Sequence, residues 1–219
     1  MPNDNYTSKD DDINTWFSHP NPIVRYLEGQ RRQMTLAAVK MSIKNGQNGL
    51  DIGCADGYLA EQLLNSSDVR IAGIELNGEL LEKAKKRLNG KKFSGYIADA
   101  RFIPINKKFD FIYCGCVLSH VANPERIIFE MHRLIKKKGN VIIQIPNDDI
   151  LLNAKKLVKV LRLQFLFPKI QMGLARDHVQ PFNLKKLKHI INNSFVIKRI
   201  DSIGPLLFSF YLVVTLEPK

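Results

Sequence analysis

Several features that mark other classes of protein are missing from this sequence of 219 residues. It has no uninterrupted apolar run of about 18 residues, so we expect no membrane-spanning helix. Residues 1–6 have neither a basic start nor an apolar core, so we expect no secretory signal. No segment repeats at a fixed period, which argues against a repeat architecture.

Cysteine is also scarce. The chain has three, Cys54, Cys114 and Cys116, and an odd number with two of them one residue apart argues against a disulfide framework. A zinc site needs about four ligands, which this spacing does not supply, so we expect no metal. We interpret the three as small reduced core residues of a cytoplasmic protein.

What is present is the composition of one ordinary globular domain. Apolar residues make up 45% and charged residues 25% of the chain. Within a single domain over residues 1–219, we expect a flexible segment at 1–15, a helical cap at 16–45 and an inserted cap at 148–175. The net charge of +12 is compatible with nucleic acid, an anionic membrane surface or an anionic substrate. The lysines are dispersed along the chain, however, which favours a solvated surface.

Short apolar runs alternate with helical patterns after the predicted cap. We expect strands at residues 49–52, 69–74, 93–98, 109–113 and 141–145, and helices at 58–65, 79–88 and 124–136. Such alternation predicts parallel strands joined by right-handed crossovers. A helix near 184–192 and two runs at 195–203 and 206–216 follow. The expected fold is α/β, a Rossmann-like doubly wound, mostly parallel seven-stranded sheet with a C-terminal antiparallel hairpin.

The turn after the first predicted strand is the strongest chemical signal. Gly53 and Gly57 permit close approach of a ligand, and the following helix offers unpaired N–H groups. Glu75 ends the second strand, where a carboxylate can accept hydrogen bonds from both hydroxyls of a ribose. Asp99 ends the third strand, where it can accept from the amine of an adenine while Ala100 donates its N–H to the ring. The alternative for Asp99 is a turn or helix cap.

Residues 50–57 resemble motif I of class I S-adenosylmethionine (SAM)-dependent methyltransferases. Glu75 resembles the ribose-binding acid of that family, and residues 99–100 resemble its adenine-contacting motif. Residues 109–121 and 134–139 resemble its fourth strand and the entry to its fifth. Residues 177–182 resemble a segment of small-molecule members, including quinone-biosynthesis methyltransferases. The resemblance covers about residues 47–216.

The resemblance implies SAM as cofactor and S-adenosylhomocysteine as product. The cofactor-binding residues that it implies are Asp51, Gly53, Cys54, Ala55, Gly57, Glu75, Leu76, Asp99, Ala100 and Cys114. Two departures stand out: Cys54-Ala55-Asp56 replaces further glycines of motif I, and residues 136–139 replace a common proline–glycine pair. The first also argues against a dinucleotide-binding dehydrogenase, whose Gly-x-Gly-x-x-Gly spacing is absent.

Two histidines are candidates for a catalytic base. His120 follows the fourth strand and His178 follows the insertion, and an imidazole can take a proton from an acidic acceptor. A structural role is the alternative for both. We interpret Arg25, Arg31 and Arg32 as surface residues, with contact to the methionine carboxylate of SAM as the alternative.

The acceptor is the least determined feature. An Asn/Asp-Pro-Pro-Tyr-like motif after the fourth strand is absent, which disfavours nucleobase amino-methyltransferases. Neither Cys114 nor Cys116 has the proline context of cytosine C5 enzymes. Residues 155–169 mix apolar and basic side chains, as in a cap over the acceptor or in an amphipathic helix on an anionic membrane.

We therefore predict methyl transfer to a small, hydrophobic or lipid-like acceptor, at oxygen, carbon or nitrogen, in the cytoplasm or at a membrane surface. The alternatives are an RNA or protein methyltransferase that uses the basic surface, and a SAM-binding protein without catalysis.

Overall fold

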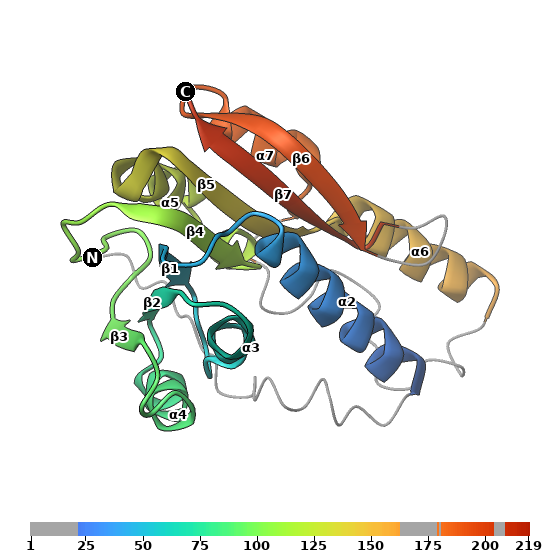
Figure 1. The fold of residues 1–219 in the computed structure, drawn as a ribbon. Coiled ribbons are helices and arrows are strands. Elements are labelled where there is room, and N and C mark those ends of the chain that lie inside the picture. Colours follow the sequence, from blue (N-terminus) through green and yellow to red (C-terminus); the bar gives the residue numbers. More distant parts are fainter. Residues whose placement is uncertain (1–21, 163–178, 180, 204–208) are drawn as a thin grey trace.

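The computed structural model describes residues 22–162, 179, 181–203 and 209–219, and these form a seven-stranded sheet flanked by helices (Figure 1). The strand order is β3-β2-β1-β4-β5-β7-β6. The strands are β1 Asn48–Ile52, β2 Arg70–Glu75, β3 Phe93–Ile97, β4 Phe109–Gly115, β5 Ile135–Pro146, β6 Phe195–Ile203 and β7 Tyr211–Pro218. The predicted flexible segment at 1–15 and the candidate base His178 lie outside the described residues.

Strand direction divides the sheet into two parts. β1, β2, β3, β4 and β5 pair in parallel, whereas β7 runs antiparallel to both β5 and β6. The strand order reverses at the neighbouring pair β1 and β4, and in doubly wound sheets ligands bind at the carboxyl ends of the strands beside this point. The structure thus confirms the predicted fold class and the C-terminal hairpin.

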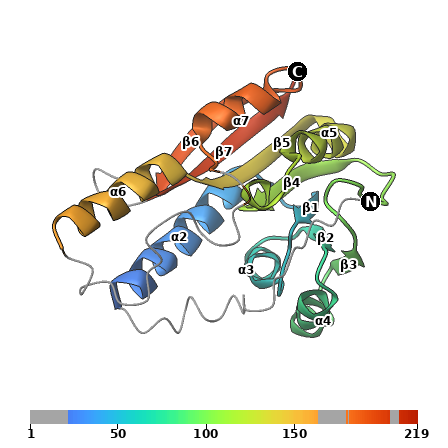
Figure 2. The same cartoon turned by 180° about the vertical axis from the view of Figure 1, so that it is seen from behind.

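Helices cover both faces of the sheet. They are α2 Pro22–Lys40, α3 Tyr58–Ser66, α4 Gly78–Arg87, α5 Pro124–Leu134, α6 Asp148–Val160 and α7 Leu184–Ile191, with a 3-10 helix η1 at Leu118–His120. α2 and α3 lie on one face, and α5 and α7 lie on the other (Figures 1 and 2). None of the helices within the described ranges combines the length and the apolar run that crossing a bilayer requires.

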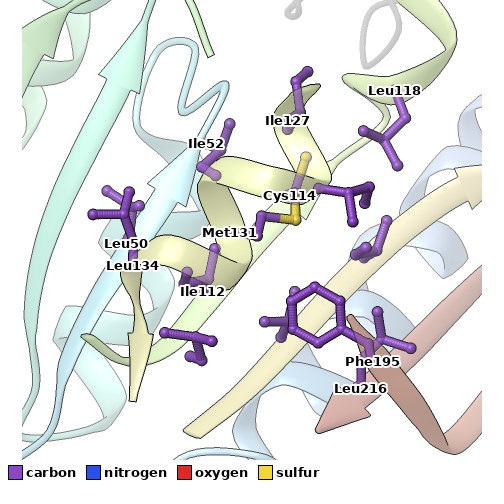
Figure 3. Packing of buried hydrophobic residues seen from close by; sticks show 14 of the residues in the cluster. Leu50, Ile52, Ile112, Cys114, Leu118, Ile127, Met131, Leu134, Phe195 and Leu216 are labelled. Atoms are coloured by element: carbon purple, nitrogen blue, oxygen red, sulfur yellow. The ribbon is translucent and has the colours of Figure 1, made fainter. Parts of the chain in front are cut away.

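The core fills both interfaces between the helices and the sheet. On the α5 side, Met131 packs with Leu50 and Cys114 of the central strands (Figure 3). On the α2 side, Ala38 and Val39 share a cluster with the neighbouring strands. Strands buried on both faces need apolar residues at successive positions, which explains the continuous apolar runs in the sequence.

The boundary between α5 and β5 differs from the prediction. The expected helix at 124–136 ends at Leu134, and the chain passes directly into β5 at Ile135. Ile135 is buried and pairs with Phe109, while the ammonium of Lys136 lies 2.8 Å from the Asp110 carboxylate. These contacts hold the chain in the sheet, so the assignment of Lys136 to a helix was wrong, and β5 is longer than the predicted 141–145.

Candidate active site

The predicted motif I turn lies at the carboxyl end of β1, where Gly53 and Gly57 adopt φ angles of 73° and 77°. A Cβ atom on Gly53 would lie 2.4 Å from a methyl carbon of Val117, which follows β4. The N–H of Gly53 donates to the carbonyl of Ile74 in β2 over 2.8 Å. Position 53 therefore requires glycine, because the backbone is left-handed there and the loop after β4 leaves no room for a Cβ atom.

Ala55 and Asp56, which stand where motif I often has glycine, occupy different structural settings. Ala55 adopts φ 48°, so it occupies a left-handed conformation that usually favours glycine. Asp56 is buried and pairs with Arg87 at the end of α4 over 2.6 Å. Arg87 also donates from Nε to the Asp56 carbonyl, so this ion pair joins the motif I turn to α4.

Glu75, the predicted ribose ligand, ends β2 with its carboxylate held by two main-chain groups. Oε2 accepts a hydrogen bond from the N–H of Ala55, and Oε1 accepts one from the N–H of Asn77, both over 2.9 Å. Asn77 is itself the N-cap of α4. Each carboxylate oxygen has two lone pairs, so this arrangement orients Glu75 and leaves acceptor capacity for two hydroxyl groups.

Asp51 lies near the carboxyl end of β1, next to Glu75 at the end of the neighbouring strand β2. Its side chain is 5% exposed, and Oδ1 has no hydrogen-bond partner within the described residues. Burial, together with the negative charge of Glu75, raises the pKa of Asp51 to about 7. A buried carboxylate without a full set of partners is costly, and a cationic ligand beside it would offset this cost. SAM carries an ammonium and a sulfonium, so the acidic pair fits the predicted cofactor.

The region predicted to contact adenine is formed by the ends of β2 and β3. The N–H of Ala98 donates to the Glu75 carbonyl over 3.1 Å, which places residues 99–100 next to Glu75. Both carboxylate oxygens of Asp99 accept hydrogen bonds from Arg101. Burial acts to raise the pKa of Asp99, but the pairing with Arg101 outweighs it and the pKa is lowered. Leu76 is half exposed at the same edge and offers an apolar surface to a base. The adenine contacts of Asp99 and Ala100, and the cofactor contact of Leu76, stay predictions.

The three cysteines are free thiols in different environments. Cys114 is completely buried in the core cluster on the α5 side, so contact with a cofactor would have to come from its main chain. Cys54 is buried in the motif I turn, and burial raises the pKa of both thiols well above the ordinary value. Cys116 adopts φ 56° directly after β4.

Of the two candidate bases, His120 lies within the described residues. It ends η1, is half-buried, and follows β4 as predicted. The N–H of Val179 donates to the carbonyl of Ser119 over 3.0 Å, so position 179 lies against η1. His132 of α5 packs edge-on against Phe195.

The arginines of α2 differ from one another. Arg25 is exposed, as expected. Arg31 is half-buried, binds Glu28 over 2.6 Å and lies over the ring of Tyr211, so it is less exposed than we expected. Arg32 lies 4.1 Å from the ring centre of Tyr58, the first residue of α3, and α2 therefore reaches the motif I turn.

Three polar residues near this turn were not predicted. Tyr113 of β4 is adjacent to Asp51 in register, and its hydroxyl donates to Oε1 of Gln144 in β5 over 2.9 Å. The amide nitrogen of Gln144 and the hydroxyl of Thr35 in α2 are buried without a partner among the described residues. In the sequence, Tyr113 and Gln144 look like ordinary strand residues, and no local pattern indicates their contact.

Metal-binding groups were searched in the same part of the chain. Within the described ranges, no three His, Cys, Asp or Glu residues form a group able to hold a metal ion. Metal independence stays a prediction, and activity in the presence of a chelator would test it.

Comparisons with known proteins agree with this geometry. Residues 50–143 match the family model of a methyltransferase domain. An uncharacterized protein of Methanocaldococcus jannaschii is 27% identical over 169 residues, which is 77% of each chain. The ubiquinone biosynthesis O-methyltransferase of Coxiella burnetii is 28% identical over 164 residues, which is 73% of this chain and 63% of that enzyme. This chain therefore spans less than two thirds of the Coxiella enzyme.

A solved structure extends the likeness to the fold. The N-methyltransferase NodS from Bradyrhizobium japonicum, in complex with S-adenosyl-L-homocysteine, superposes with a TM-score of 0.67 at 18% identity, over 93% of this chain and 91% of that chain. The methyltransferase-domain match over residues 50–143, the sheet order, the motif I turn and these relatives together support a class I SAM-dependent methyltransferase.

Proposed function

We propose that this methyltransferase acts on a small acceptor of hydrophobic or lipid-like character. The observation that carries the proposal is α6, which begins two residues after β5 at the edge of the sheet that holds motif I. This helix buries only Asp148 and leaves Leu157, Val160 and Leu161 more than half exposed. An exposed apolar face on the helix that follows β5 suits an acceptor with apolar bulk.

The residues at this edge have distinct tasks in methyl transfer. SAM supplies a methyl group already activated by its bond to a positively charged sulfur. Glu75 and Asp51 would hold and orient the cofactor, and the loops after β1 and β4 would exclude water from the methyl group. Holding the acceptor in line with the carbon–sulfur bond supplies much of the rate enhancement, because alignment replaces a random encounter.

A base is required only when a neutral hydroxyl, amine or carbon acid must lose its proton. The proposed bases are His120, the last residue of η1, and His178, which lies outside the described residues. Alanine substitution of either, measured at saturating concentrations of both substrates, should lower turnover, with His189→Ala on α7 as the control. Unchanged turnover in both variants would remove general-base catalysis by these histidines.

The methylated atom is left open by the proposal. One of the relatives above is named as an O-methyltransferase and the other as an N-methyltransferase, so their names favour neither atom. We further propose that residues 155–169 permit peripheral contact with an anionic membrane, since Lys155, Lys156, Lys159 and Arg162 accompany the apolar residues of α6.

Methyl-labelled SAM provides the test. The purified protein is incubated with labelled SAM and an extract of its own cells, and label is counted in the organic, small aqueous, RNA and protein fractions. We expect label in the organic or small aqueous fraction. Label confined to RNA or protein would overturn the proposal and favour an acceptor bound through the basic surface, which a strong salt dependence of binding would then test.

A further inference from the structure

A row of polar side chains runs along the α2 face of the sheet, from the motif I turn to the end of β5. Asp51, Tyr113 and Gln144 come from the neighbouring strands β1, β4 and β5. Tyr113 joins the row, since it is adjacent to Asp51 in register and its hydroxyl binds the amide of Gln144. The row therefore leads from the cofactor residues to the part of the sheet where α6 begins.

The Gln144 end of this row has unused hydrogen-bonding capacity. Gln144 is 3% exposed, and its amide nitrogen has no partner within the described part of the chain. Exchanging the positions of the amide oxygen and nitrogen of Gln144 would not supply the missing hydrogen bond. The Tyr113 hydroxyl would then bind the nitrogen, and the oxygen would be left without a partner. A buried amide without a full set of hydrogen bonds is destabilising, which is a reason to expect a ligand there.

The groups around Gln144 favour a ligand oxygen. The N–H of Cys116 donates to the Gln144 carbonyl over 2.9 Å, and a guanidinium nitrogen of Arg31 lies 3.9 Å from the Cys116 thiol. Glu28, an acid of this cluster, is already bound by Arg31. The atom of Gln144 that lacks a partner is an N–H donor, and a ligand oxygen can accept its hydrogen bond whereas a protonated amine cannot.

We propose that the side-chain amide of Gln144 binds an oxygen atom of the methyl acceptor, so that the preferred acceptors are hydroxyl-, carbonyl- or carboxylate-bearing molecules rather than simple amines. This inference rests on the proposed function, because it concerns the same site. Gln144 acts as a specificity-determining residue: it fixes the orientation of the acceptor and takes no part in bond making.

Binding of defined probes tests the inference. Catechol and 3,4-dihydroxybenzoate serve as oxygen probes and tryptamine as the amine probe, each titrated calorimetrically at millimolar concentration in the presence of saturating S-adenosylhomocysteine. We expect the oxygen probes to bind more tightly than tryptamine. Gln144→Met, which keeps the size but removes the amide, should weaken the oxygen probes about tenfold or more and leave S-adenosylhomocysteine binding unchanged.

Two further variants separate a binding role from a structural one. Gln144→Glu keeps an oxygen for the Tyr113 hydroxyl but lacks the amide donors, so we expect it to lose the oxygen probes and to bind tryptamine better. Thr215→Val is the control, since Thr215 is also buried and lies two residues from Val213, the β7 partner of Gln144. It should affect thermal stability without affecting probe affinity.

Each remaining outcome has a definite meaning. Tighter binding of tryptamine by the wild type, unchanged probe affinity in both Gln144 variants, or no binding of either oxygen probe by a protein that binds S-adenosylhomocysteine would overturn this inference alone. Failure of the wild type to bind S-adenosylhomocysteine would instead overturn the proposed function. Gln144→Glu keeps the experiment decisive if Gln144→Met does not fold.

Discussion

At the scale of single residues, the protonation of Asp51 should make stability depend on pH. Burial and the charge of Glu75 raise its pKa to about 7, whereas an unfolded chain would release the proton at about pH 4. Between these values the folded protein holds a proton that the unfolded chain has lost. The unfolding free energy should therefore fall as pH rises through this interval, by up to about 1.4 kcal/mol per pH unit.

Asp51→Asn should remove this dependence. We expect the variant to gain stability relative to the wild type as pH rises from about 4 to about 7, in urea unfolding without cofactor. Asp110→Asn is the control, and it should lose stability relative to the wild type as pH rises. Burial acts to raise the pKa of Asp110, but hydrogen bonds from Asn48 and Lys136 outweigh it and lower the pKa. A constant difference between wild type and Asp51→Asn at all pH values would contradict the prediction.

Gly57 and Gly90 allow backbone strain to be separated from steric overlap. Their φ angles are 77° and 75°, but a Cβ on Gly57 would lie 2.9 Å from Leu88 and 3.0 Å from Ala84, whereas nothing lies within 4 Å of one on Gly90. Gly90→Ala should cost about 1–2 kcal/mol from strain alone. Gly57→Ala should cost about 1–3 kcal/mol more, because neighbours in α4 must move. Urea unfolding measures both, and equal losses would show that the contacts of Gly57 relax freely.

The site residues that could be predicted are those marked by a pattern in the neighbouring sequence. The motif I glycines and Glu75 sit at strand ends that apolar runs mark, so their position follows from the sequence. Tyr113 and Gln144 are 31 positions apart, and their contact arises from the pairing of β4 with β5. Nothing near either residue indicates the other, which is why the polar row was not predicted.

At the scale of elements, α6 should decide whether the protein binds membranes. Val160 is 77% exposed at its end, beside Lys159 and Arg162. Val160→Glu places a negative charge on this face and should weaken binding to phosphatidylglycerol-rich vesicles about tenfold, since inserting one valine is worth about 1.5 kcal/mol. Vesicle sedimentation measures the effect.

Val196→Glu is the matched control, because Val196 is 53% exposed on the edge strand β6, away from α6. It should leave vesicle binding unchanged. Equal binding by both variants and the wild type, or no preference for phosphatidylglycerol over phosphatidylcholine, would mean that the exposed residues of α6 do not contact lipid.

The elements themselves were predicted better than their boundaries. Periodicity locates α5, but the same lysine-rich segment is compatible with a helix end and with a strand start. The pairing of Ile135 with Phe109 decides between them, and this long-range contact is invisible in the local pattern. Antiparallel addition of β7 to β5 similarly follows from tertiary pairing, although two terminal apolar runs indicated a hairpin.

At the scale of the whole molecule, cofactor binding should stabilise the fold. A ligand at about a hundred times its Kd adds about 2.7 kcal/mol to the unfolding free energy. In a domain of this size, 1 kcal/mol raises Tm by about 2–4 °C, so S-adenosylhomocysteine should raise Tm by about 5–10 °C. The site joins β1, β2 and α4 through Glu75 and Asp56, so the cofactor should stabilise these elements together.

Glu75→Gln tests whether this linkage passes through the predicted ribose contacts. The glutamine keeps the size but loses the charge and one acceptor oxygen, and we expect a loss of about 2 kcal/mol in binding. At the same S-adenosylhomocysteine concentration, the stabilisation should then fall below about 1 kcal/mol. Asp110→Asn, a carboxylate remote from the site, should lower Tm in the absence of ligand but keep the full shift. A ribose bound at the end of β2 should lose affinity when its charged acceptor is removed. If Glu75→Gln kept the wild-type Tm shift, the cofactor would therefore be held by other groups.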